Sequence, residues 1–516
     1  MALLVAAAMA VAPTAALASE TMESVFQDDD ALLHSTPDQV AATVAELRDL
    51  GVERLRLSVI WRNLAPPEPP PDPGDPAAYP AEQFDPLDHA IRTARAHGLE
   101  VLLNVRGGAP AWAMPAAPGR LAGRDGYVPS PGDFRGFTAM LGRRFDGTYA
   151  DENHGGRPLP RATAWSIWNE PNWGGHLQPQ SVRDPERGLV TVAPRHYRRL
   201  FRAAVQALVA TGHGAETILL GETAPIGNAK LGELSHLRPV RFLRDLFCLN
   251  RRLEPVRRRA YVRRRCDFDT RGPLPATGFA HHPYPVTAPP GRPSADRRFL
   301  TFGDTPRLKR ILDAAARAKR IAPGLPIWFT EFGYQTAPPD PFRGVTLEQQ
   351  ARYLVEAEYL AWADPRVVAL TQFLLRDDEP RALYPEGDPR RWATYQSGLR
   401  FGDGTPKPAY DAYRLPMRAP RRIRPGRALD LWGMVRPGVN GQAQRVRIEH
   451  RADGAETWTA VAETTATTPK GHFVARVDRP RAGTYRFVWL QPGNPAQPPA
   501  TPSPQTEVLL DRLRPP

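Results

Sequence analysis

Short apolar runs alternate with amphipathic segments along most of the chain. The runs have the length of buried strands, and the segments between them carry apolar residues at helical spacing. In one such segment Pro37 stands in the first turn and Gly51 ends the helix. Between them Val40, Val44 and Leu47 share one face. This alternation is typical of a parallel sheet with helices packed against it.

Eight strand–helix units are predicted between residues 19 and 415. The strands are expected at residues 23–27, 54–59, 100–105, 164–168, 217–221, 278–281, 327–330 and 367–374. The helices are expected at about residues 36–50, 85–98, 133–145, 194–209, 240–250, 305–319, 347–362 and 408–413. Eight units predict an α/β fold closed into a (β/α)8 TIM barrel, in which the carboxyl ends of all strands point to one face.

The pattern changes near residue 416. Residues 416–427 are basic and rich in proline, which indicates a linker. Residues 428–493 alternate between apolar and polar at period two with turn residues between the runs, which predicts a small all-β sandwich of immunoglobulin or fibronectin type. Residues 494–516 are rich in proline, and we expect a partly disordered tail there.

Two glutamates stand at the ends of predicted strands. Glu170 follows the run 164–168 in Trp-Asn-Glu-Pro, and Glu331 follows the run 327–330 in Thr-Glu-Phe-Gly. A salt-bridged or turn-capping role would explain either one alone. Together on one barrel rim, they form the carboxyl pair that glycoside hydrolysis requires. Glu170, beside Trp168, is expected to be the protonated acid/base, and Glu331 the anionic nucleophile.

Four polar side chains are expected around this pair. Asn169 is placed to bind a sugar 2-hydroxyl, with a turn-forming asparagine as the alternative. Arg56, in the second strand, is placed to pair with the nucleophile, with a surface arginine as the alternative. His282 would reach the acid or the sugar, and Tyr284 would donate a hydrogen bond to Glu331 and keep it ionised.

Aromatic residues near strand ends are candidates for stacking on sugar rings. Trp61, Trp112 and Trp173 are expected to bind substrate in this way, although each also fits a place in the core. Glu222, after the fifth strand, is a rival carboxylate, and we expect it to be a substrate contact or rim residue and not a catalyst.

We expect neither a metal nor an organic cofactor. His281 and His282 are adjacent in a strand and so face opposite ways, and no third ligand stands nearby. His281 is either packed in the core or placed at the rim.

The net charge and the first residues of the chain give expectations about binding partners and cellular location. The net charge of +13 comes from arginine, since only five of the 68 basic residues are lysine. No nucleic-acid-binding motif accompanies the charge, so no nucleic-acid partner is expected. Residues 1–18 are an apolar run ending in Ala-Leu-Ala, which predicts a signal peptide, although its positive start is missing. No later run is long enough to cross a membrane.

The two cysteines, Cys248 and Cys266, flank an arginine-rich segment. In an oxidising compartment they would form a disulfide, and two unpaired thiols are the alternative. The arginines at 251–265 are expected to be solvated, with attraction of uronate or phosphate groups as the alternative.

Residues 20–415 resemble the retaining glycoside hydrolases of clan A, in particular the family 5 cellulase-like and family 39 xylosidase-like enzymes. The resemblance is carried by Trp-Asn-Glu-Pro at 168–171, Thr-Glu-Phe-Gly at 330–333, Arg56 in Arg-Leu-Ser-Val-Ile-Trp, and His-Pro-Tyr at 282–284. It implies a TIM barrel that acts on carbohydrate with Glu170 and Glu331 in the roles given above. The chain departs from the family at the end of the eighth strand, where Phe373 stands at the place of a frequent tryptophan.

The sequence therefore predicts a secreted retaining β-glycosidase that hydrolyses O-glycosidic bonds of a β-linked oligosaccharide or polysaccharide. Two alternatives remain open: a non-catalytic extracellular glycan-binding protein on the same barrel, and a transglycosylase that uses the same residues. The sugar, the choice between exo and endo action, the role of the sandwich and the oligomeric state are not predicted.

Overall fold

The computed structural model describes residues 19, 21–114, 126–438, 443–466, 468, 470–490 and 501–510. The predicted signal peptide at 1–18 lies outside these residues. Within the described part of the chain, no helix combines the length and the apolar character needed to span a bilayer.

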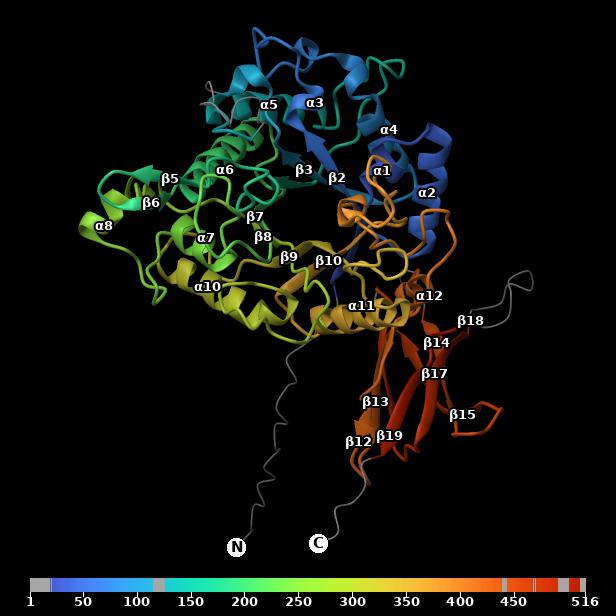
Figure 1. Ribbon diagram of the computed structural model, residues 1–516. Coiled ribbons are helices and arrows are strands. Elements are labelled where there is room, and N and C mark those ends of the chain that lie inside the picture. The colour runs from blue at the N-terminus through green and yellow to red at the C-terminus, as the bar shows by residue number, and fades with distance from the viewer. Residues whose placement is uncertain are drawn as a thin grey trace, which may run out of the picture.

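Eight parallel strands form a closed barrel, which confirms the predicted fold (Figure 1). In barrel order they are β1 (Glu23–Gln27), β2 (Arg54–Ile60), β3 (Glu100–Arg106), β4 (Ala164–Ile167), β7 (Thr217–Thr223), β8 (Gly278–His281), β9 (Ile327–Phe332) and β10 (Val367–Phe373). Each coincides with a predicted strand, because the continuous apolar runs are buried on both faces, as parallel strands require.

Helices surround the barrel. The helices at predicted positions are α2 (Pro37–Asp49), α4 (Asp85–Ala96), α5 (Pro131–Arg144), α6 (Ala193–Ala210), α7 (Pro239–Leu246), α10 (Thr305–Arg317), α11 (Leu347–Trp362) and α12 (Pro408–Arg414). Short elements that the sequence did not predict are α1 (Asp29–Leu33), α3 (Trp61–Leu64), α8 (Arg258–Arg263), α9 (Phe268–Arg271) and the hairpin of β5 (Ser181–Asp184) and β6 (Gly188–Thr191).

The barrel interior changes from apolar to polar toward the carboxyl ends of the strands. A separate buried cluster fills the lower layer with Val25, Leu102, Ala164, Leu219, Ala280, Trp328 and Ala369. Since side chains alternate along a strand, positions two residues further on face the same interior. Those positions include Gln27, Asn104, Ser166, His282 and Thr330. The interior therefore has a polar upper layer at the carboxyl ends of the strands.

The C-terminal region forms two small sheets around a core of its own, next to α11 and α12 (Figure 1). One sheet contains β11 (Met417–Arg418), β13 (Leu429–Met434) and β16 (His472–Val477). The other contains β12 (Arg422–Ile423), β14 (Gln444–Arg451), β15 (Thr459–Ala466), β17 (Gly483–Leu490), β18 (Thr501–Pro502) and β19 (Thr506–Leu510). This arrangement agrees with the predicted sandwich.

Two predicted boundaries of the sandwich need correction. The segment 416–427, expected as a linker, contains β11 and β12, which pair with β13 and β19. Residues 501–510, expected in a partly disordered tail, contain β18 and β19, which both pair with β17. β11 and β12 are edge strands, where nearby prolines are tolerated because one side of the strand makes no ladder hydrogen bonds, and composition alone does not reveal such pairing.

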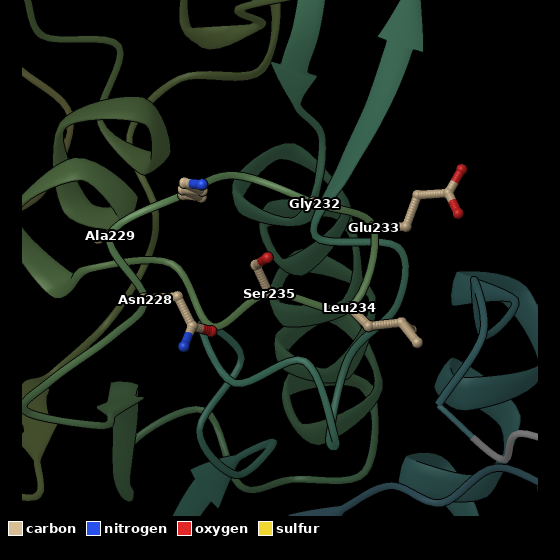
Figure 2. Close-up of a pocket in the computed structure, with 7 residues that line it drawn as sticks. Asn228, Ala229, Gly232, Glu233, Leu234 and Ser235 are labelled. Carbon is tan, nitrogen blue, oxygen red and sulfur yellow. The ribbon is translucent and has the colours of Figure 1, made fainter.

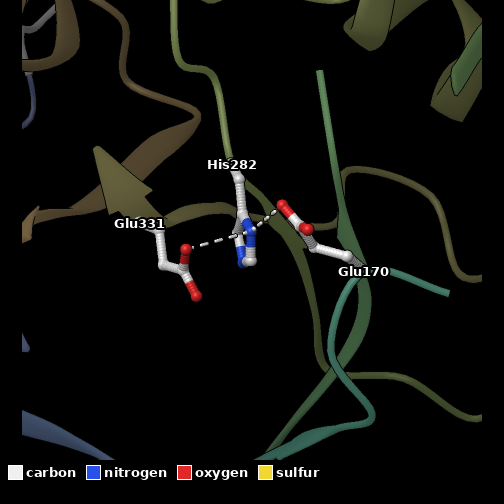
Figure 3. Close-up of side chains that lie close together, drawn as sticks. All are labelled: Glu170, His282 and Glu331. Atoms are coloured by element: carbon white, nitrogen blue, oxygen red, sulfur yellow. Dashed lines mark hydrogen bonds and ion pairs between the residues drawn. The ribbon is translucent and has the colours of Figure 1, made fainter. Parts of the chain in front are cut away.

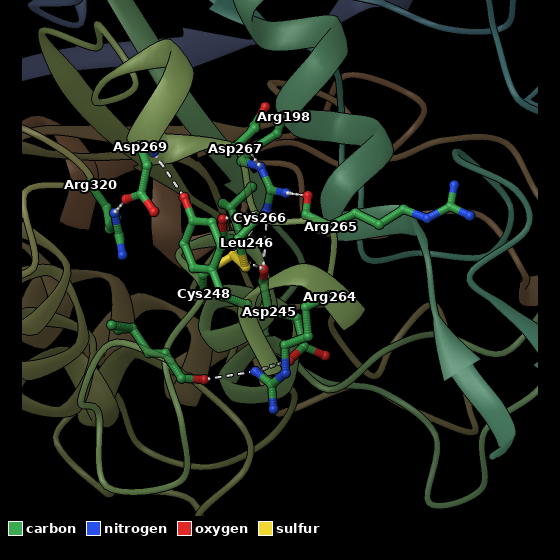
Figure 4. The surroundings of a disulfide bond; sticks show 12 residues. Arg198, Asp245, Leu246, Cys248, Arg264, Arg265, Cys266, Asp267, Asp269 and Arg320 are labelled. Carbon is green, nitrogen blue, oxygen red and sulfur yellow. Dashed lines mark hydrogen bonds and ion pairs between the residues drawn. A yellow bond between two sulfur atoms is a disulfide. The ribbon is translucent and has the colours of Figure 1, made fainter. Parts of the chain in front are cut away.

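Cys248 and Cys266 form a disulfide that joins the chain after α7 to the chain before α9 (Figure 4). Arg198 of α6 donates to this segment, with Nε 3.0 Å from Asp267 Oδ1 and Nη2 3.0 Å from the Arg265 carbonyl oxygen. The arginine-rich loop is thus tied to the barrel wall at both ends.

A buried ion pair joins the sandwich to the barrel. Arg436, which follows β13, donates to Glu358 of α11 with Nη1 3.0 Å from Oε2, and its Nη2 lies 2.7 Å from Ser24 Oγ in β1. Both charged side chains are almost fully buried. A charge buried in this way depends on its partner, because neither is solvated.

Removing one partner of this pair tests the junction. Arg436→Ala leaves Glu358 buried without its counter-charge, and we expect the free energy of unfolding to fall by about 3–5 kcal/mol in urea denaturation. The double variant Arg436→Met with Glu358→Met removes both charges, and its free energy of unfolding is expected to fall by less than that of Arg436→Ala. A loss below about 1 kcal/mol for Arg436→Ala, as at an exposed pair, would contradict this role.

Candidate active site

The turn after β4 carries Glu170 in a strained backbone conformation. Trp168 has φ 70° and Glu170 has φ 41°, a region that residues other than glycine seldom occupy. Neighbouring strands hold the turn: Asn104 Nδ2 donates to the Trp168 carbonyl at 2.7 Å, and the Glu170 N–H donates to the Glu222 carbonyl at 2.8 Å. Strain that the surroundings enforce in this way is common at functional sites.

Glu170 and Glu331 lie on either side of His282 (Figure 3). His282 Nδ1 is 3.0 Å from Glu170 Oε1 and 3.4 Å from Glu331 Oε2. One carboxylate oxygen of each glutamate and a ring nitrogen of His282 all lie within 4.8 Å of one another. The two glutamates from β9 and the β4 turn therefore share one small site, as their strand positions predict.

Arg56 lies fully buried beneath Glu331. Its Nη1 is 3.0 Å from Glu331 Oε1, and its Nη2 is 3.0 Å from Asn169 Oδ1. From the other side, Tyr284 Oη donates to Glu331 Oε2 at 3.2 Å. The contacts expected of Arg56 and Tyr284 with Glu331 are thus present. The Asn169 oxygen thus accepts from Arg56, and its amide nitrogen lies 3.5 Å from His176 Nδ1.

Glu222 does not lie at the rim, and this corrects the prediction that it is a rim residue or substrate contact. Its side chain is 0% exposed. Its Oε2 lies 2.8 Å from Arg56 Nη2, 2.6 Å from His282 Nε2 and 3.1 Å from Thr330 Oγ1. Glu222 is therefore a third carboxylate of the same network, and its side chain is fully buried.

The charges of this network shift the pKa values of its members. Burial lowers the pKa of His282, but Glu331, Glu170 and Glu222 outweigh it and raise that pKa to about 10. Burial raises the pKa of Glu222, and the charges of Arg56 and His282 outweigh it and lower that pKa to about 2. His282 is therefore an imidazolium and Glu222 a carboxylate at neutral pH.

The pKa of Glu170 differs from the sequence-based expectation of a protonated acid. Burial raises it, but the hydrogen bond and charge of His282, with smaller effects of His176 and Arg106, lower it overall. Trp168, expected to desolvate the carboxyl, instead packs its ring edge-on against Phe134 at 5.3 Å. In the free protein Glu170 is thus a carboxylate stabilised by a cation.

Glu170, His282 and Glu331 are grouped closely enough to surround a metal ion. The contacts of His282 argue against that use, because Nδ1 faces Glu170 and Nε2 faces Glu222. A metal ligand needs a neutral ring nitrogen with a free lone pair, which an imidazolium lacks. His281 turns the other way, with Nε2 2.7 Å from the Leu300 carbonyl oxygen, and is packed in the core.

The three predicted sugar-stacking tryptophans differ in position. Trp61 is 0% exposed and stacks on Phe137 at 5.6 Å, so its prediction as a substrate contact is wrong. Trp112 is partly buried, and its Nε1 donates to the Pro66 carbonyl at 2.9 Å. The Trp173 ring stacks face to face on His236, with ring centres 3.4 Å apart. Its backbone N–H donates to the Glu170 carbonyl at 2.8 Å. Of the three, Trp173 is hydrogen-bonded directly to the turn that carries Glu170.

Loop residues that the sequence analysis did not identify complete the site. Tyr395 is 50% exposed and meets Phe373 edge-on at 5.3 Å. Burial of its phenol, followed by the charges of Glu170 and Glu331, raises the pKa of Tyr395 to about 12. His176 Nδ1 lies 3.6 Å from Glu170 Oε2. Neither residue follows a strand, so no periodic pattern marks it.

An open hollow of about 670 Å³ lies in the loop after β7 (Figure 2). It is lined by Asn228, Ala229, Lys230, Gly232, Glu233, Leu234 and Ser235. None of the network carboxylates lines it. The loop joins the site at its next residue, His236, which stacks on Trp173.

Comparison with known proteins gives a likeness of fold. No family model and no curated protein matches the chain. Among solved structures, the chain is similar to a GH5_18 protein from Streptomyces cattleya in complex with GlcNAc, at 16% identity over 79% of this chain and 85% of that chain, with a TM-score of 0.46. It is also similar to aphid myrosinase, at 12% identity over 76% and 97% of the two chains, with a TM-score of 0.41. At such identities the likeness says nothing about substrate.

Proposed function

We propose that the protein is a retaining β-glycosidase that hydrolyses O-glycosidic bonds of a β-linked saccharide. The observation that carries the proposal is the approach of the Glu170 and Glu331 carboxylates to within 4.8 Å at their nearest oxygens. Retaining enzymes hold their carboxyl groups about 5–5.5 Å apart, whereas inverting enzymes need about 6.5–9.5 Å to admit a water molecule.

In the first step a carboxylate oxygen of Glu331 attacks the anomeric carbon. The bond to the leaving oxygen breaks while Glu170 gives that oxygen its proton, and a glycosyl ester forms on Glu331. Arg56 and Tyr284, both in contact with Glu331, fix the direction of attack. The Asn169 amide donates to a sugar hydroxyl next to the reacting carbon.

In the second step water replaces the ester. Glu170, now a carboxylate, takes a proton from the water, whose oxygen bonds to the anomeric carbon as the ester bond breaks. The cation of His282 beside Glu170 favours this basic form. The same cation opposes the protonated form that the first step needs, so the proposed enzyme works best in acidic solution.

We propose further that the protein acts outside the cytoplasm. The disulfide between Cys248 and Cys266 supports this, since such bonds persist in oxidising compartments. The apolar run at residues 1–18 supports it as well.

Trapping tests the nucleophile. A screen of aryl β-glycosides first identifies an accepted sugar, and its 2-fluoro glycoside then slows hydrolysis of the ester more than its formation. We expect mass spectrometry to find the label on Glu331 and none in Glu331→Gln. A label on another residue would exclude the assigned roles.

Replacing the acid/base separates the two roles of Glu170. Glu170→Ala should lower kcat/KM by about 10²–10⁴-fold for substrates whose leaving group needs a proton. The loss should be smaller for activated aryl leaving groups, and azide should restore turnover by taking the place of the activated water. Equal losses for both kinds of substrate, without rescue, would contradict this role.

The pH dependence of kcat/KM tests the effect of His282 on Glu170. Because the pKa of Glu170 is lowered, its protonated fraction disappears as pH rises, and activity should fall on the alkaline side of an acidic optimum. His282→Gln removes the cation and raises the pKa of Glu170, so the alkaline limb should move up by about one pH unit or more. An unchanged limb, or a shift toward acid, would refute this coupling.

A further inference from the structure

Strand β7 bends where it presents Glu222. Gly221 has φ 124° and Glu222 has φ 47°, and the register with β8 slips between Leu220 and Thr223. A Cβ on Gly221 would lie 2.4 Å from the Ala280 carbonyl oxygen, so the bend requires glycine. A bulge of this kind redirects a side chain. Here it turns the carboxylate of Glu222 under the reacting pair.

One oxygen of Glu222 joins the two buried cations of the site. Oε2 lies 2.6 Å from His282 Nε2 and 2.8 Å from Arg56 Nη2. Thr330 Oγ1 donates to the same oxygen at 3.1 Å. Since the carboxylate is fully buried, it does not contact a substrate. Burial of a third carboxylate costs free energy, and an apolar side chain at this position would avoid that cost. Stability alone therefore does not explain a glutamate here.

We propose that Glu222 is a positioning residue that holds His282 as an imidazolium, with its Nδ1–H directed at Glu170 and Glu331. The effect of Glu222 on catalysis rests on the proposed function, whereas its effect on the protonation of His282 does not depend on any activity. The hydrogen bond at one ring nitrogen of a histidine sets the state of the other. With Nε2–H held by Glu222, the proton on Nδ1 is left for the reacting carboxylates.

The charge balance around His282 gives Glu222 a distinct place. The ionisable groups that face the ring or its partners are Asp29, Arg56, Arg106, Glu170, His176, Glu222, His236, His281, Tyr284, Glu331 and Tyr395. Burial lowers the pKa values of His176 and His281 to about 4, so both are neutral. Glu170 and Glu331 both change charge during the proposed reaction. Glu222 is the carboxylate that keeps its charge throughout and thereby keeps His282 protonated.

The test follows the ring nitrogens of His282 by ¹⁵N NMR in the full-length protein without substrate. The His282 signals are assigned by their loss in His282→Gln. In the parent protein we expect both ring nitrogens to stay protonated at pH 8. In Glu222→Gln, which keeps the shape and removes the charge, the midpoint of deprotonation should fall by about one pH unit or more. In activity assays kcat should fall while KM changes little.

Glu358→Gln is the matched control. It also neutralises a buried glutamate that pairs with an arginine, Arg436, but at the junction with the sandwich. We expect it to lower stability and to leave the His282 titration and the pH profile of activity unchanged. This comparison separates a positioning role from a general loss of structure.

An unchanged His282 titration in folded Glu222→Gln would overturn the inference, whether or not the protein hydrolyses glycosides. Should that variant fail to fold, Glu222→Asp keeps the charge but withdraws the oxygen from Nε2, and the midpoint should still fall, by a smaller amount. No fall in that variant would equally overturn it. If the parent hydrolyses no glycoside, the proposed function fails while the NMR result still decides the role of Glu222.

Discussion

Five charged side chains at the carboxyl end of the barrel, three of them fully buried, depend on one another. Three carboxylates, those of Glu170, Glu222 and Glu331, surround two cations, Arg56 and His282. Each charge removed from water costs several kcal/mol, which its neighbours offset only in a good geometry. Loss of any one member leaves the others without compensation. The charges of the interior thus help to hold these side chains in place.

The barrel makes room for this network by layering its interior. Side chains from seven strands close the lower interior with apolar atoms, and the next inward position is polar for six of these seven strands. The apolar layer keeps the charges at one end, where the strained turn at Glu170 and the bend at Glu222 both place their carboxylates. Strand period and backbone bends together therefore position the site.

The sequence predicts what depends on local pattern. The strand that carries Glu331 was found because its apolar run is continuous, and the rim position of Glu170 followed from the barrel. Trp61 was misplaced because aromatic residues in the core and in a cleft have the same local signature. The prediction of Glu222 as a rim residue is wrong because a bulge in β7 turns its side chain inward. In the sequence, only the neighbouring Gly221 indicates this bulge. Tyr395 comes from a loop whose place depends on tertiary contacts alone.

The proposed chemistry requires Glu170 to be an acid first and a base afterwards, beside a cation that favours the base. Formation of the ester removes the charge of Glu331, and His282 then faces Glu170 and Glu222 alone. The most direct measurement of this double displacement is the anomeric configuration of the first product, followed by ¹H NMR before mutarotation. Two displacements predict that the β-anomer of the released sugar appears first. Initial release of the α-anomer would contradict the assignment of Glu331 as nucleophile.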